Sequence, residues 1–436
     1  MESSMTEPTS RNIVILCDGT GNEISENISN VLKLYRCLRK TPKTQPRQIV
    51  YYDPGVGTLS RPSTWTRWKQ NFNLILGLAT GYGLDDNVLS AYEFLARTWR
   101  EGDRIYLFGF SRGAYTVRVL AGLIHKIGLI APEQVNLAGS GLIAYKQFSS
   151  DTPSQGLDLS VLTDGGDGPR PVNRFDNAAQ FARITSARAP TIHFIGVWDT
   201  VASVIVPRAD RFWLWPSLEE LAFTIANPSV KSFRQAIAID ERRRMFRLKP
   251  WDDPQTYLSN RWKDHDKGEP QDILQVWFSG VHADIGGGYA EAESHVSKYP
   301  LLWMIGEAVA CGITVNTQRV RQLAWGIQRK GSPFSYVAPD FKADAHDSMN
   351  WAWRLLETVP KRTHYREWPA RKSLAGFYIP CKEPRIIPEG AVIHESVLKR
   401  IEARGDYRPV NLPKVYKIFD MPEPPTAGAA AEDAEE

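Results

Sequence analysis

The chain has 436 residues, of which 42% are apolar and 23% are charged, a composition typical of a globular protein with a sizeable core. Its net charge of +4 is small for this length, and Lys and Arg are interspersed with Asp and Glu, so we expect no nucleic-acid partner. No uncharged apolar run reaches the roughly 18 residues that a membrane span requires, so we expect no transmembrane segment.

Cysteine usage and the N-terminus both favour a cytoplasmic location. The N-terminus lacks the basic segment followed by an apolar stretch that marks a secretory signal. The four cysteines lie far apart, with no CxxC pair and no histidine at metal-ligand spacing: Cys17, Cys37, Cys311 and Cys381. We therefore expect a reducing compartment, no metal site and no organic cofactor.

The first half of the chain alternates between strand and helix patterns. Residues 1–10 form a polar lead that we expect to be disordered. The continuous apolar run at 12–17 predicts a strand buried on both faces of a parallel sheet, and it ends at Asp18-Gly19-Thr20. Further elements are predicted at residues 31–38 (helix), 48–52 (strand), 84–99 (helix), 103–110 (strand) and 113–127 (helix).

The second half continues the alternation, with strands predicted at 190–198 and 273–278. Together these elements predict the α/β class, with a doubly wound, mostly parallel sheet in one domain over residues 11–420. Residues 203–262, which include Trp213 and Trp215, do not fit the alternation and are predicted to form a helical insert that caps the sheet. The tail at 421–436 has few bulky apolar residues and is expected to be disordered.

One short motif carries nucleophile chemistry. Gly109-Phe110-Ser111-Arg112-Gly113 matches the G-x-S-x-G pattern, lies after a predicted strand and opens a predicted helix. In this setting the serine is held at a strained turn with its hydroxyl exposed, and the glycines leave room beside it. The motif therefore predicts Ser111 as a nucleophile. The competing interpretation is an ordinary β–α turn with a polar cap.

A nucleophilic serine needs a general base, and the base needs an orienting carboxylate. In α/β-hydrolases the chain order is serine, acid, histidine. Asp199 directly follows the predicted strand at 190–198, and His282 lies just beyond the strand at 273–278, so both lie after strand ends. We predict Asp199 as the acid and His282 as the base, with Asp240 and Asp284 as rival acids.

The developing oxyanion requires backbone N–H donors. One donor is expected from Arg112, the residue after the nucleophile, and the second from a glycine-bearing loop after an early strand. Gly19 and Thr20 are the candidates for that loop, whose alternative role is a simple strand–helix turn.

Two other functions remain open on the residues alone. Cys17-Asp18-Gly19-Thr20 is similar to the D-x-D-G-T loop of haloacid-dehalogenase-like phosphotransferases, but Leu16 occupies the position of their nucleophilic aspartate. A non-catalytic interaction protein with the same fold is the other alternative, although such a protein has no physical need for a complete set of serine, aspartate and histidine.

Four motifs together resemble the α/β-hydrolase family formerly called DUF2235, which includes the catalytic domain of the type VI secretion phospholipase effectors of the Tle1 type. These motifs are residues 17–22 (CDGTGN), 109–115 (GFSRGAY), 196–201 (GVWDTV) and 280–289 (GVHADIGGGY). The resemblance spans about residues 11–415 and implies a Ser111, Asp199 and His282 triad. It also implies hydrolysis of a small-molecule or lipid ester through an acyl-enzyme, a chemistry that is compatible with peripheral membrane contact.

Overall fold

The computed structural model describes residues 10–19, 27–55, 83–151, 176–201, 205–206, 217–218, 221–259, 268–349, 351–363 and 366–421. Within these residues the centre is an eight-stranded sheet in the order β15-β14-β10-β7-β4-β3-β1-β2, with every pairing parallel. The strands are β1 (Asn12–Cys17), β2 (Gln48–Asp53), β3 (Arg104–Phe110), β4 (Ile192–Trp198), β7 (Val230–Ala238), β10 (Asp272–Phe278), β14 (Val392–His394) and β15 (Lys417–Phe419). The predicted α/β class with a mostly parallel central sheet is confirmed.

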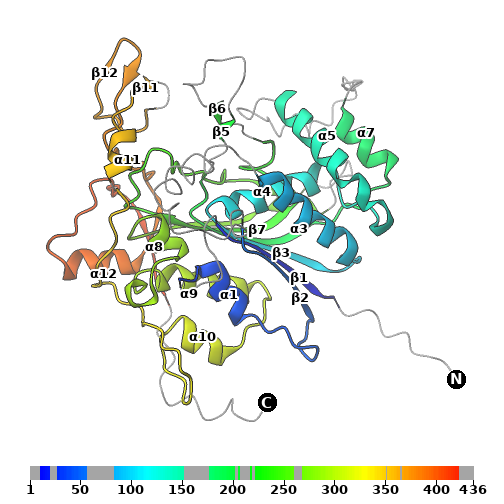
Figure 1. Cartoon of the computed structure of the whole chain (residues 1–436), viewed down its shortest axis with the longest axis horizontal. Helices are drawn as coiled ribbons and strands as arrows, with labels where there is room; N and C mark the ends of the chain where they lie inside the picture. Colours follow the sequence, from blue (N-terminus) through cyan, green and yellow to red (C-terminus); the bar gives the residue numbers. More distant parts are fainter. Residues whose placement is uncertain are drawn as a thin grey trace, which may run out of the picture.

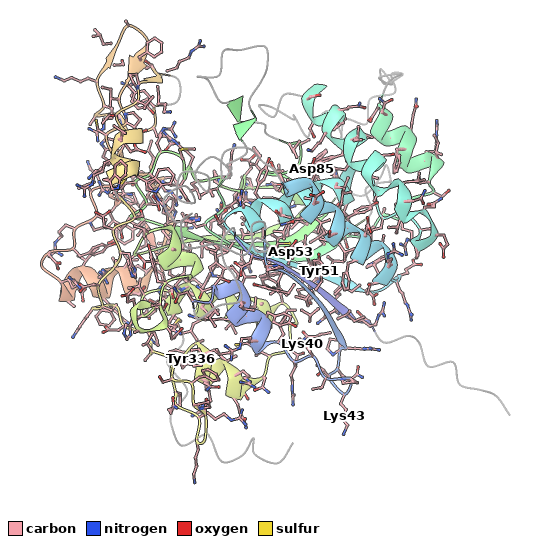
Figure 2. All side chains as sticks on the ribbon, in the orientation of Figure 1. Lys40, Lys43, Tyr51, Asp53, Asp85 and Tyr336 are labelled. Carbon is pink, nitrogen blue, oxygen red and sulfur yellow. The ribbon has the colours of Figure 1, made fainter. Side chains whose placement is uncertain are left out.

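Helices cover both faces of the sheet (Figure 1). One layer contains α3 (Leu84–Thr98), α4 (Arg112–Lys126), α5 (Ala138–Asp151) and α7 (Asn177–Ile184). The opposite layer contains α1 (Asn30–Cys37), α9 (Lys298–Ala310) and α10 (Thr317–Leu323). Each layer encloses its own apolar core, because successive side chains of a strand point to opposite faces. On the first face, for example, Tyr51 of β2, which is labelled in Figure 2, packs against Phe94 of α3 with ring centroids 5.0 Å apart.

The local sequence explains why these elements form. All six residues of β1 are buried, as expected for an apolar strand covered on both faces. Ser29 caps α1, since its hydroxyl accepts a hydrogen bond from the amide of Leu32 at 3.1 Å. Helix α4 is buried along nearly its whole length, which its run of small and apolar residues permits.

The segment predicted as a helical insert, residues 203–262, contains a strand of the central sheet instead. β7 occupies Val230–Ala238 and pairs with β4 on one side and β10 on the other. The strand could not be recognised from its hydrophobic pattern, because it contains Arg234 and Gln235. Both residues are buried and have hydrogen-bond partners on other elements. Trp213 and Trp215 lie outside the described residues.

The strand order reverses at β1, which lies between β2 and β3. In open α/β sheets, ligands bind at such a reversal, outside the carboxyl ends of the strands. Asp18 follows β1 and Ser111 follows β3, so both residues lie at this position.

Smaller elements lie outside the sheet: α8 (His282–Gly286), α11 (Trp351–Leu356), α12 (Glu395–Ala403), η1 (Pro132–Leu137), η2 (Glu291–Glu293), β5 (Ile205–Val206), β6 (Ser217–Leu218), β8 (Thr256–Tyr257), β9 (Glu269–Pro270), β11 (Lys361–Arg362), β12 (Ser373–Leu374) and β13 (Phe377–Tyr378). Among the helices that the structure describes, none has the length and apolar character needed to cross a bilayer.

Candidate active site

Ser111 lies in the turn between β3 and α4 in a strained conformation. Its backbone angles are φ 57° and ψ −118°, a combination that residues other than glycine rarely adopt. The amide of Ser111 donates to the carbonyl of Trp198 at 3.2 Å, which ties the turn to the end of β4. The serine is therefore held at a sharp bend at the carboxyl end of the sheet, 8% exposed.

The flanking glycines allow this bend to approach the end of β1. A Cβ atom on Gly113 would lie 2.1 Å from the carbonyl oxygen of Cys17, and one on Gly109 would lie 2.5 Å from the carbonyl oxygen of Gly113. Both separations are far below van der Waals contact. The two glycines of the motif are thus required by close packing, and they bring the N-terminus of α4 against the loop that begins at Asp18.

Asp199 and His282 are hydrogen-bonded to each other. Asp199 directly follows β4 and also has a positive φ of 39°, while His282 is the first residue of α8. Nδ1 of His282 donates to Oδ2 of Asp199 at 2.5 Å, and both residues are buried. The structure thus joins two residues that are 83 positions apart in the sequence.

A second partner of Asp199 was not predicted from the sequence. Arg385 donates from both terminal nitrogens to the carboxylate, at 2.5 Å to Oδ1 and 3.0 Å to Oδ2. The amide of Ala238, at the end of β7, also donates to Oδ1, at 3.0 Å. No local motif surrounds Arg385, and the only available signal was the general need of a buried carboxylate for a cation.

These partners determine the charge of Asp199. Burial alone would raise the pKa of its carboxyl group, but the positive charge of Arg385 and the hydrogen bond from His282 together lower the pKa well below its ordinary value. Asp199 is therefore a carboxylate at neutral pH.

The imidazole of His282 is neutral near pH 7. Burial lowers the pKa of His282, and the hydrogen bond with Asp199 opposes that effect only in part. With Nδ1 donating to the carboxylate, the neutral ring carries its lone pair on Nε2. Nε2 is buried and has no hydrogen-bond partner in the part of the chain that the structure describes. A buried acceptor of this kind is ready to take a proton.

The serine turn and the histidine turn pack against each other through Phe110. The ring of Phe110, the residue before Ser111, lies 4.7 Å from the ring of His282 between centroids. A Cβ atom on Gly286, at the end of α8, would lie 2.0 Å from the Phe110 ring. The two segments that carry Ser111 and His282 are thus in direct contact.

The rival acids have other partners. Asp284 accepts from the amide of Val281 at 3.0 Å and pairs with Nδ1 of His346 at 2.7 Å. Asp240 accepts from the amide of Gly280 at 2.7 Å. Among the described residues, Asp199 is the acid that contacts the His282 ring, and the other two hold the surrounding loop.

A buried glutamate supports the backbone of the histidine turn. Glu241 accepts from the amide of His282 at 3.2 Å and forms an ion pair with Arg243 at 2.7 Å. Burial raises the pKa of Glu241, but Arg243 outweighs that effect and lowers it. The guanidinium of Arg243 also lies over the ring of Phe246, which in turn contacts His282.

The structure places the predicted oxyanion donors in different environments. Arg112 is the first residue of α4, so its amide lies at the positive end of the helix dipole, directly beside Ser111. The amide of Gly19 instead donates to the carboxylate of Asp18 at 2.7 Å. Thr20 lies outside the described residues.

Asp18 itself is buried and accepts from the hydroxyl groups of Ser29 and Tyr52, the latter at 2.9 Å. These bonds fit a structural role in the loop better than attack on a phosphoryl group. No group of three or more His, Cys, Asp or Glu side chains suited to a metal ion occurs within the described ranges.

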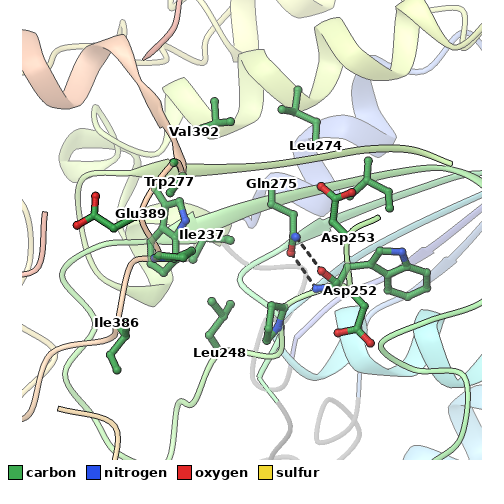
Figure 3. Close-up of a pocket in the computed structure, with 16 residues that line it drawn as sticks. Ile237, Leu248, Asp252, Asp253, Leu274, Gln275, Trp277, Ile386, Glu389 and Val392 are labelled. Atoms are coloured by element: carbon green, nitrogen blue, oxygen red, sulfur yellow. Dashed lines mark hydrogen bonds between the residues drawn. The ribbon is translucent and has the colours of Figure 1, made fainter. Parts of the chain in front are cut away.

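A cavity of about 540 Å³ lies between β7, β10 and the segment that leads into β14 (Figure 3). Its apolar lining includes Ile237 and Ile386, which are chain neighbours of Ala238 and Arg385. The side-chain amide of Gln275 bonds both backbone groups of Trp251 at the cavity wall, at 2.8 and 2.9 Å. The volume is within the range of about 300 to 1,000 Å³ that is usual for small-molecule sites.

Comparison with known proteins identifies the family. The family model for the phospholipase effector Tle1-like catalytic domain of the type VI secretion system matches residues 11–307. The chain belongs to this family. Ser111, Asp199 and His282 all lie inside the matched region of the Tle1-like domain, whereas Arg385 lies outside it.

Relatives of this Tle1-like chain are considerably longer. The uncharacterized protein YEL023C of Saccharomyces cerevisiae is 30% identical over 243 residues, which cover 54% of this chain and 32% of the yeast protein. An uncharacterized protein from Pseudomonas aeruginosa is 18% identical, with 70% of this chain and 46% of that chain covered at a TM-score of 0.34. The Tle1 effector bound to the VgrG spike is 17% identical, with 66% and 53% covered at a TM-score of 0.29. The chain thus spans about a third to a half of the relatives that it matches.

Proposed function

We propose that the protein is a serine hydrolase of the α/β-hydrolase fold that cleaves carboxylic esters of lipids through an acyl-enzyme. One observation carries this proposal: His282 donates from Nδ1 to the buried carboxylate of Asp199 and keeps an unpartnered, buried Nε2 within the described residues. The strained Ser111 turn at the reversal of strand order, packed through Phe110 against the His282 ring, supports the same reading.

In the proposed reaction, Oγ of Ser111 attacks the ester carbonyl carbon while Nε2 of His282 takes the hydroxyl proton. The bond to the alcohol oxygen then breaks, and the imidazolium returns the proton to the leaving alcohol. Water attacks the acyl-enzyme in the same way and releases the carboxylic acid, which restores the serine. Asp199 keeps Nδ1 protonated and stabilises the imidazolium throughout.

The oxyanion of each tetrahedral intermediate would accept from the amide of Arg112, at the N-terminus of α4. A second donor from Gly19 requires its amide to leave Asp18, so binding of substrate would have to rearrange this loop or use Thr20. A preorganised donor of this type contributes about 100- to 1,000-fold in rate.

The family and the cavity both favour a lipid substrate. The matched family is that of phospholipase effectors, and the cavity, whose walls include Ile237, Trp277 and Ile386, offers a place for an acyl chain. The chemistry of the proposed triad requires only an ester, so chain length would be set by the cavity walls.

A fluorophosphonate probe tests the nucleophile directly. We expect the probe to label the parent protein and not the Ser111→Ala variant, and we expect the parent to hydrolyse a series of p-nitrophenyl esters. The matched control is Ser140→Ala, a serine in α5 away from the strand ends. Labelling that persists in Ser111→Ala would refute the assignment, and a parent that neither reacts nor turns over esters would favour a non-catalytic interaction protein.

A further inference from the structure

Residues 351–382 form a projection that extends from one side of the molecule. It begins with α11 and continues into a three-stranded antiparallel sheet in the order β11-β13-β12, in which each strand is two residues long. In Figure 1, β11 and β12 lie at the outer end of this unit, away from the central sheet. Residues 364 and 365 are outside the described part. We call residues 351–382 the projection.

The projection exposes large apolar side chains. Leu374 is 85% exposed, Trp351 70% and Leu355 63%. Six of the fifteen exposed large apolar residues identified in the described ranges lie in these 32 residues: Trp351, Leu355, Val359, Leu374, Phe377 and Ile379. Single exposed apolar residues are ordinary, but a concentration of this kind marks an interaction surface.

The same unit concentrates positive charge. It contains seven Lys and Arg residues against two Glu, although the whole chain has a net charge of only +4. Both glutamates interact with arginines outside the projection. Glu357 is buried and accepts from the amides of Arg244 and Lys382, at 2.6 and 3.4 Å, and Glu367 forms an ion pair with Arg247. The outer surface of the projection is therefore basic as well as apolar.

The base of the projection contacts the candidate active site. Trp353 of α11 packs against Phe246 with ring centroids 5.6 Å apart, and Phe246 packs against His282 at 4.9 Å. The projection is therefore anchored beside the proposed catalytic histidine through its base.

We propose that the projection binds the surface of anionic lipid bilayers, with its apolar side chains in the acyl boundary and its cations on the lipid phosphates. Elements with this combination of exposed apolar and basic residues lie in the membrane interface without spanning it. This proposal rests on the function proposed above, because binding to a bilayer would bring the enzyme to its lipid substrate. Binding itself can be measured without ester hydrolysis. A flat protein partner would need a broad complementary face, which strands of two residues do not provide.

The test is vesicle binding by the full chain carrying Ser111→Ala, so that the lipid is not consumed. Sedimentation would use phosphatidylcholine vesicles and equimolar phosphatidylcholine–phosphatidylglycerol vesicles. We expect binding to the anionic vesicles only. Leu374→Asp should weaken it about tenfold or more, because an exposed leucine that enters the bilayer is replaced by a charge. Lys372→Glu should weaken it by at least about fivefold.

Two control variants match these changes elsewhere on the surface. Ile184→Asp replaces an apolar residue that is 78% exposed at the end of α7, on the other side of the molecule from β12 (Figure 1). Lys43→Glu reverses a charge that lies far from the projection (Figure 2). Both should bind like the parent. In a Ser111 background, all four variants should keep the parent rate on a soluble short-chain ester.

The outcomes separate the two proposals. Loss of binding in the Leu374 and Lys372 variants alone supports the projection as the lipid surface, whether or not esters are hydrolysed. The proposal is overturned if the parent ignores anionic vesicles, if it binds neutral vesicles equally well, or if the control variants lose as much binding. The proposal would also be overturned by two results together: an acidic protein displaces the parent from vesicles, and the Leu374→Asp variant still binds vesicles.

Discussion

Arg385 and His282 bind the same carboxylate, that of Asp199, from segments that are more than a hundred residues apart. Each therefore affects the other's electrostatics. Arg385 keeps Asp199 ionised, but it also draws away part of the negative charge that would otherwise stabilise a protonated His282. The arrangement therefore lowers the pKa of His282 relative to a histidine that pairs with an aspartate alone.

We expect Arg385→Met to destabilise the protein by about 3 to 5 kcal/mol, because it leaves a buried carboxylate without its cation. The folded-state pKa of Asp199 is lowered, so the ion pair stabilises the protein above the ordinary carboxyl pKa and is lost as the pH falls through the folded-state value. The variant lacks this pair, so the difference in stability between parent and variant should be largest above the ordinary carboxyl pKa and should shrink as the pH falls below it. Urea denaturation at several pH values measures it.

The same variant should change the kinetics in a way that simple loss of stability would not. With Arg385 absent, the pKa of His282 should rise, so the acid limb of kcat/KM against pH should move to higher pH. Arg385→Lys retains the charge and should show a smaller shift. An unchanged pH profile in folded Arg385→Met would limit Arg385 to a structural role.

In the parent protein the acid limb should fall below the ordinary histidine pKa of about 6.5. Burial lowers the pKa of His282, so the neutral, proton-accepting form persists at lower pH than in an exposed histidine. Rates on a soluble ester from about pH 4.5 to 8.5, a range set by about two units on either side of that pKa, would show the limb. A midpoint above 7 would contradict the proposed environment of His282.

Two substitutions at Ser111 separate strain from chemistry. Both Ser111→Ala and Ser111→Gly should abolish ester turnover. Because φ is 57°, glycine relieves backbone strain that alanine retains, so Ser111→Gly should be the more stable variant by about 1 kcal/mol. Thermal unfolding of the pair gives this difference, and equal stability would show that the bend is not strained.

Gly113→Ala should unfold the protein more easily by about 3 kcal/mol and remove activity, since its Cβ would meet the backbone of Cys17 at 2.1 Å. The control is Gly306→Ala in α9, where an added Cβ meets no atom within 4 Å. That change should stabilise the protein by roughly 0.5 to 1 kcal/mol through helix propensity. Similar stabilities for the two variants would disprove the close contact.

Ile386 offers a test of the cavity as an acyl site. It lines the cavity and is 46% exposed, so substitutions there should be tolerated. Ile386→Trp should narrow the cavity and shift the preferred ester to a shorter acyl chain, whereas Ile386→Ala should favour a longer one. A chain-length series of esters measures both, and an identical preference in the two variants would place the acyl chain elsewhere.

Much of the fold could be predicted because its signals are local. The apolar runs that end at Cys17, Phe110, Trp198 and Phe278 are strands of the central sheet, since a parallel strand buried on both faces must be apolar throughout. The chain order of serine, aspartate and histidine after such strands was enough to select Asp199 and His282, which the structure joins by a hydrogen bond.

The residues that could not be predicted depend on distant partners. Arg234 of β7 is buried because Asp272 and Glu307 neutralise it, so the strand does not look like one in the sequence. Arg243 belongs to a run of charged residues that looks like a solvated surface in the sequence, yet it pairs with the buried Glu241 beside His282. Burial of Arg234 depends on ion pairs with residues far away in the chain. Burial of Arg243 depends on an ion pair with Glu241, whose own burial no sequence pattern reveals.

β7 acts as a spacer between the strands that precede Asp199 and His282. Neighbouring strands are about 4.8 Å apart, so β4 and β10 are separated by about 10 Å, and the two side chains meet across the end of β7. The carbonyl of Ala236 and the amide of Ala238 both bond Asp199. A one-residue insertion in β7 would carry the Ala238 amide away from the carboxylate and turn the following side chains to the opposite face. The spacing between the strands that carry the proposed acid and base is thus set by the backbone of β7, a strand that supplies no reacting group.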